Sequence, residues 1–206
     1  MRHPLLLSLT VLPLMFACGD VTDNNNTGTI DAAPIDAAPA TACEMYCTNA
    51  MTNCTGANTL YPGMSECMTA CAAMPEGTTA DQSGDTAYCR AYHAGVPASG
   101  MPDLHCPHAS TSSNSDICGT LCEAYCDQVM SHCMGTNKLY DNRAACDAAC
   151  TGANFTEGAF NDVAGDTIQC RIYHASFPAA GNPGLHCPHA KVTPALGTPC
   201  TTAALQ

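Results

Sequence analysis

The cysteines constrain this chain more than any other feature, because they make up seventeen of its 206 residues and sixteen of them repeat in a fixed order. The spacings within two successive sets of eight agree through the fifth cysteine and differ by two residues at the sixth. The first set is Cys43, Cys47, Cys54, Cys67, Cys71, Cys89, Cys106 and Cys118, and the second is Cys122, Cys126, Cys133, Cys146, Cys150, Cys170, Cys187 and Cys200. The chain is therefore a tandem duplication, and each copy has enough cysteines for four disulfides.

The rest of each copy offers little hydrophobic core. Between Cys43 and Cys118 the large aliphatic and phenylalanine side chains are limited to Leu60, Val96, Leu104 and Ile117. A module this small is marginally stable even with a good core, and ordering each residue costs about 1–2 kcal/mol. Disulfides that contribute about 2–4 kcal/mol each can offset that cost. We therefore expect all sixteen cysteines to be paired, which requires an exported protein.

The cysteine spacings also predict helices. Cys43, Cys47 and Cys54 are four and seven residues apart and share one face of a helix that is expected to end near Gly56. A second helix carries the next two cysteines, again four apart, and a third is expected to start at 85–86, before an irregular segment rich in proline and glycine. The predicted fold is mainly α and disulfide-rich, with two copies of a helical hairpin, a third short helix and an irregular C-terminal loop.

Two C-x-x-x-C helices that fold antiparallel bring their cysteines together in pairs, a layout similar to known twin C-x-x-x-C helical hairpins. The other four cysteines of each copy can pair in several ways, and a Cys118–Cys200 bridge between the copies is an alternative. The hairpin pairs predicted are Cys43–Cys71, Cys47–Cys67, Cys122–Cys150 and Cys126–Cys146. The remaining pairs predicted are Cys54–Cys89, Cys106–Cys118, Cys133–Cys170 and Cys187–Cys200.

The N-terminus has the features of a signal peptide. Arg2 precedes an apolar run over residues 5–17 that is too short to span a bilayer. The run ends in Leu14-Met15-Phe16-Ala17-Cys18-Gly19, which resembles the cleavage box of bacterial lipoproteins. That resemblance implies cleavage before Cys18 and lipidation of its thiol. The expected location is the cell envelope, at the outer membrane or cell surface, held by the lipid alone.

A polar segment follows Cys18 and contains the repeated sequence Asp-Ala-Ala-Pro. It has almost no large apolar residue and cannot bury a core, so we expect an extended tether. The predicted boundaries are a signal peptide over residues 1–17, the lipidated cysteine and tether over 18–42, the first copy over 43–118 and the second over 119–206.

The charge excludes some partners. The chain has six basic and eighteen acidic residues and a formal net charge of −12, so it offers no basic patch for nucleic acid. Electrostatic attachment to anionic lipid is disfavoured for the same reason. The motifs of phosphate-binding loops, serine hydrolases and zinc proteases are absent, and we expect no enzymatic activity.

Three histidines recur at equivalent positions of both copies although the segments before them, 72–83 and 151–164, have diverged. Three imidazoles suit zinc or copper, and a thiolate from Cys106 would strengthen such a site. The alternative is that Cys106 is in a disulfide and the histidines are packing residues around it. The candidate metal ligands are His93, His105 and His108 in the first copy and His174, His186 and His189 in the second.

Two functions remain open from the sequence. The first is an envelope lipoprotein that acts as a disulfide-stabilised interaction or scaffold module and requires no cofactor. The alternative is a periplasmic or surface protein that binds copper or zinc through three histidines per copy. The convergence or divergence of the imidazoles in space distinguishes the two.

Overall fold

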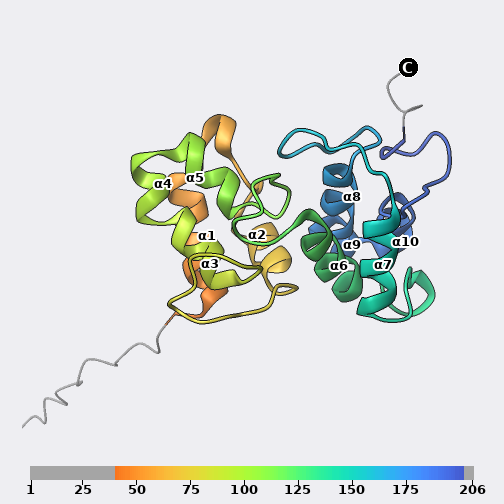
Figure 1. Ribbon diagram of the computed structural model, residues 1–206, viewed down its shortest axis with the longest axis horizontal. Coiled ribbons are helices and arrows are strands. Elements are labelled where there is room, and N and C mark those ends of the chain that lie inside the picture. Colours follow the sequence, from red (N-terminus) through yellow and green to blue (C-terminus); the bar gives the residue numbers. More distant parts are fainter. Residues whose placement is uncertain (1–39, 202–206) are drawn as a thin grey trace, which may run out of the picture. The chain divides into compact units, whose positions relative to one another are not determined.

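The computed structural model describes residues 40–201, and over this range the protein is helical. An isolated bridge between Thr156 and Thr167 is the only β pairing in that part of the chain. None of its helices is long and apolar enough to span a membrane. The first copy contains α1 (Ala42–Asn53), η1 (Gly56–Asn58), α2 (Met64–Cys71), α3 (Ala87–Ala94), α4 (Val96–Gly100) and α5 (Pro102–Ala109). The second contains α6 (Leu121–His132), η2 (Gly135–Asn137), α7 (Arg143–Gly152), α8 (Ile168–Ala175), α9 (Phe177–Gly181) and α10 (Pro183–His189) (Figure 1).

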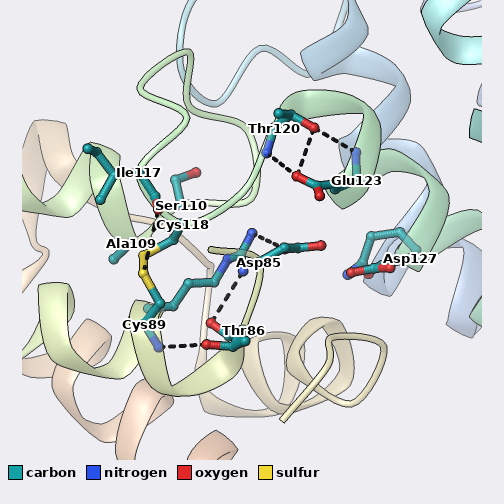
Figure 2. Close-up of polar contacts among 12 residues, drawn as sticks. Asp85, Thr86, Cys89, Ala109, Ser110, Ile117, Cys118, Thr120, Glu123 and Asp127 are labelled. Atoms are coloured by element: carbon teal, nitrogen blue, oxygen red, sulfur yellow. Dashed lines mark hydrogen bonds and ion pairs between the residues drawn. A yellow bond between two sulfur atoms is a disulfide. The ribbon is translucent and has the colours of Figure 1, made fainter. Parts of the chain in front are cut away.

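The first helix of each copy begins at a capping box. The Thr41 hydroxyl accepts from the Glu44 amide, and the Glu44 carboxylate accepts from the Thr41 amide at 2.7 Å. Thr120 and Glu123 repeat the arrangement before α6 (Figure 2). These reciprocal bonds satisfy amides that have no partner within the helix, so they fix where each copy begins.

The hairpin disulfides form as predicted. Cys43 is bonded to Cys71 and Cys47 to Cys67, and these bridges join α1 to α2. The second copy repeats them between α6 and α7, as Cys122–Cys150 and Cys126–Cys146. The C-x-x-x-C spacing is therefore sufficient to place these four bridges.

The other four pairings predicted from the sequence are wrong. Cys54–Cys89 and Cys106–Cys118 do not form, and neither do Cys133–Cys170 and Cys187–Cys200. No bridge joins the copies within residues 40–201, so Cys118–Cys200 is also excluded. The structure instead contains Cys54–Cys106, Cys89–Cys118, Cys133–Cys187 and Cys170–Cys200.

The direction of α3 explains the difference. Asn49 donates to the Ala91 carbonyl, and Asn53 donates to the Ala94 carbonyl one turn further on, so α1 and α3 run in the same direction. Cys54, at the end of α1, therefore lies beside the end of α3, whereas Cys89 lies in its first turn. This arrangement leaves Cys89 to pair with Cys118 (Figure 2).

The segment predicted to be irregular is shorter than expected. After α3, residues 96–109 form α4 and α5 in the first copy, and within this predicted loop region only the stretch from Ser110 to Cys118 lacks regular structure. Pro97 and Pro102 lie in the first turns of these helices, where a missing amide hydrogen costs no helical bond. The prolines that suggested a loop therefore start two short helices.

Cysteine, alanine and tyrosine fill most of the core of both copies, and the second copy adds Val129, Ile168 and Ile172. Tyr46 and Tyr125 are fully buried, and their hydroxyls donate to the carbonyls of Ala109 and Ala190. These bonds tie the first helix of each copy to the end of the helix that carries two of the repeated histidines. The aromatic core thus fixes the position of α5 and α10.

A buried arginine in each copy forms an ion pair with an aspartate five residues before it. Arg90 lies 2.8 Å from Asp85, and Arg171 lies 2.6 Å from Asp166. Burial and the neighbouring Asp85 raise the pKa of Asp127 to about 7 (Figure 2). Arg90 and Arg171 are therefore engaged in ion pairs within the protein and have a structural role.

Candidate metal centre

The three repeated histidines of each copy come from two packed helices. In the first copy, His93 lies in the last turn of α3, and His105 and His108 lie three residues apart on one face of α5. In the second copy, α8 carries His174, and α10 carries the other two. In each copy, one helix therefore contributes one imidazole to the cluster and the other helix contributes two.

The side chains converge in both copies. The Nδ1 atoms of His93 and His105 are 3.1 Å apart, and those of His174 and His186 are 2.9 Å apart. In each cluster one nitrogen from each of the three imidazoles lies within 4.8 Å of the others. Nitrogens about 2.0–2.1 Å from one tetrahedral ion are about 3.3 Å apart, so small side-chain adjustments would accommodate zinc.

A backbone carbonyl orients one imidazole of each cluster. His93 Nε2 lies 3.0 Å from the Gln82 carbonyl, and His174 Nε2 lies 3.2 Å from the Val163 carbonyl. A carbonyl can only accept, so Nε2 carries the hydrogen and Nδ1 presents its lone pair to the cluster. Metal-binding histidines are commonly held in this way by a bond at the other ring nitrogen.

The third imidazole has an unused nitrogen. Among the described residues, the buried Nδ1 atoms of His108 and His189 have no hydrogen-bond partner. A buried nitrogen without a partner costs free energy, and the same cost occurs in both copies. The third imidazole of each cluster therefore has a buried nitrogen that no protein group within residues 40–201 occupies.

The environment favours neutral imidazoles, the form that binds metal. Burial lowers the pKa of His93 and of His108, with further lowering by neighbouring histidines. In the second copy burial lowers the pKa of all three, and that of His174 falls to about 4. The lowered pKa values keep these five imidazoles in the neutral form at neutral pH.

The cysteines near the clusters are not available as ligands. Cys106 is bonded to Cys54, so the thiolate considered from the sequence does not exist in the folded protein. The sulfurs of Cys89 and Cys118 also lie near His93, but they are bonded to each other. Each candidate site therefore consists of three imidazoles, without a carboxylate or a thiolate.

The two orienting carbonyls could not be identified from the sequence. Gln82 and Val163 lie in the segments where the copies share almost nothing. A backbone carbonyl is present whatever side chain the residue carries, so these segments can diverge and still hold the imidazole. Nothing in the residue types indicates this role.

The fold and clusters define a small, disulfide-rich, all-α protein built from two tandem copies of one domain. The family model for the BfoA family C-terminal domain matches the chain twice, over residues 17–120 and 109–202. The chain therefore belongs to this family. No curated protein and no solved structure matches it.

Proposed function

We propose that this protein is an exported, lipid-anchored protein that binds two zinc or copper ions, one in each copy. The observation that carries the proposal is the convergence of three imidazoles at equivalent positions of both copies. Neutral nitrogen ligands suit both metals, and the absence of carboxylates in the clusters disfavours calcium and magnesium. The disulfides serve in this proposal as the frame that holds the ligands.

A scaffold function without metal accounts for less of the structure. It requires the disulfides and the buried tyrosines, but not three histidines that point at one another in each copy. Packing alone would also leave the buried Nδ1 atoms of His108 and His189 without compensation. Metal binding therefore explains features that a purely structural module does not need.

Elemental analysis of the mature protein, purified from the envelope without chelator, tests the proposal. We expect zinc or copper at a ratio approaching two ions per chain. A variant with alanine at both His105 and His186 controls for metal held elsewhere on the surface. Equal metal content in the variant and the natural protein would contradict the proposal.

The anchor is a separate part of the proposal, because residues 1–39 lie outside the described residues. The Cys18→Ala variant should lose its acyl group and leave the membrane fraction. Metabolic labelling with a palmitate analogue, followed by fractionation, measures both effects. Undiminished labelling of this variant would show that Cys18 is not the lipidated residue.

The proposed sites should release metal in acid, and the second copy should release it at the lower pH. A histidine with a lowered pKa stays neutral until the pH falls through that lowered value, and protonation then removes a ligand. All three pKa values are lowered in the second copy, and that of His174 is about 4. Zinc release can be followed with a chromophoric indicator between pH 8 and 4.

The single variants His105→Ala and His186→Ala report the two copies separately in this titration. His186→Ala retains only the first site, and His105→Ala retains only the second. If the amount of bound zinc does not change between pH 8 and 4, the ligands are not imidazoles. Release of zinc from the second copy at a higher pH than from the first would contradict the lowering of its histidine pKa values by burial.

A further inference from the structure

A cleft of about 290 Å³ lies between residues of the first copy and residues of the second. Three aromatic rings and four aliphatic side chains dominate its lining. The Tyr61 ring of the first copy contacts the Phe177 ring of the second copy edge to face, with centroids 6.4 Å apart. The apolar lining consists of Leu60, Tyr61, Pro62, Val163, Ile172, Tyr173 and Phe177.

Packing fixes the walls of this cleft. Tyr61 is only 5% exposed, and its hydroxyl is hydrogen-bonded to that of Tyr46. The Tyr173 ring contacts Phe177 edge to face at 5.4 Å, and Ile172 belongs to the core of the second copy. A ligand would therefore meet rings that are already in place, which reduces the entropic cost of binding.

The polar groups of the lining restrict the ligand's charge. No lysine or arginine lines the cleft, and Asp162 supplies its only charged side chain. The hydroxyls of Ser110 and Ser112 are hydrogen-bonded to each other, and that of Ser176 donates to the Tyr173 carbonyl. An anion would meet Asp162 without a compensating cation, whereas an uncharged ring with a donor would suit both the apolar walls and the carboxylate.

The first copy does not repeat these walls. Its equivalent of Phe177 is Val96, which is 85% exposed, and its equivalent of Tyr173 is Tyr92, which is 42% exposed. The cleft is thus a property of the second copy at its junction with the first. We propose that it binds a small, uncharged aromatic compound with a hydrogen-bond donor, of the phenol or indole class.

The cleft lies next to one histidine cluster only. Val163 lines the cleft, and its carbonyl holds His174. The Tyr173 ring also contacts the His174 ring edge to face, with centroids 5.1 Å apart. A compound in the cleft should therefore perturb the His174 resonances and leave those of His93 unchanged.

Indole is a suitable probe, and the experiment uses the metal-free mature protein with its disulfides intact. Calorimetry measures its affinity, and NMR of the histidine side chains reports its position. We expect Tyr173→Ala and Phe177→Ala each to weaken binding at least about tenfold, because each removes a ring that contacts the ligand. The matched variants Tyr92→Ala and Val96→Ala of the first copy should bind as the natural protein does.

Three outcomes would overturn the proposal. One is no binding of indole at millimolar concentration, and another is binding that Tyr173→Ala and Phe177→Ala leave unchanged. The third is an equal perturbation of His93 and His174. Circular dichroism of each variant verifies folding, and Tyr173 is suited to substitution because it is only half-buried. Because metal is absent throughout, the result is independent of the proposed metal sites.

Discussion

Replacing His105 with alanine should abolish one of the two proposed metal sites and leave the other in place. The substitution removes one of three nitrogen ligands, and the two that remain cannot close the site around the ion. We expect the zinc affinity of the first copy to fall at least about 100-fold, because changes in the groups that merely orient ligands already cost 10–100-fold. The second copy uses its own three imidazoles and should be unaffected.

Competition with a chromophoric chelator measures both affinities in one titration. His186→Ala should give the mirror-image result, with loss of the second site alone. His132→Ala is the matched control, because this histidine belongs to neither cluster and the first copy has Asn53 at the equivalent position. Loss of an ion from His132→Ala, or two tight sites in His105→Ala, would contradict the assignment.

Removal of the Cys54–Cys106 disulfide should destabilise the first copy by about 4 kcal/mol. The bridge closes a segment of 52 residues, and chain-entropy arguments give a value of that size for such a loop. The loss is large relative to the 5–15 kcal/mol that stabilises typical domains. Urea unfolding of the Cys54→Ala, Cys106→Ala double variant measures it.

The same substitution should weaken zinc binding in the first copy, because Cys106 lies between the two histidines of α5. Substitution of Cys133 and Cys187, whose bridge spans 54 residues, is the matched control and should affect only the second copy's site. Peptide mapping under non-reducing conditions tests the pairing itself. A peptide that joins Cys54 to Cys89 would contradict the fold described here.

The parts of the fold that follow from local spacing were predictable from the sequence. Cysteines four residues apart share a helix face, so two such helices specify the hairpin and its bridges to Cys67 and Cys71. The recurrence of three histidines likewise indicated which side chains converge. Both inferences depend on periodicity within one helix and on comparison of the copies.

The remaining bridges depend on how helices far apart in the sequence are oriented. The direction of α3 relative to α1 separates Cys54 from Cys89, and it is fixed by contacts such as that of Asn49 with a carbonyl on α3. No spacing reveals such a contact. The cleft was not predictable for a related reason, since Tyr61 and Phe177 come from different copies and meet only in the folded chain.

The central claim is that each copy holds one metal ion with three imidazoles, and native mass spectrometry tests it most directly. The mature, disulfide-intact protein is stripped of metal, titrated with zinc at neutral pH and weighed at each step. We predict two successive additions of one zinc ion and no third tight addition, with both lost from the His105→Ala, His186→Ala double variant. A natural protein that remains metal-free, or that binds zinc equally well without these histidines, would contradict the claim.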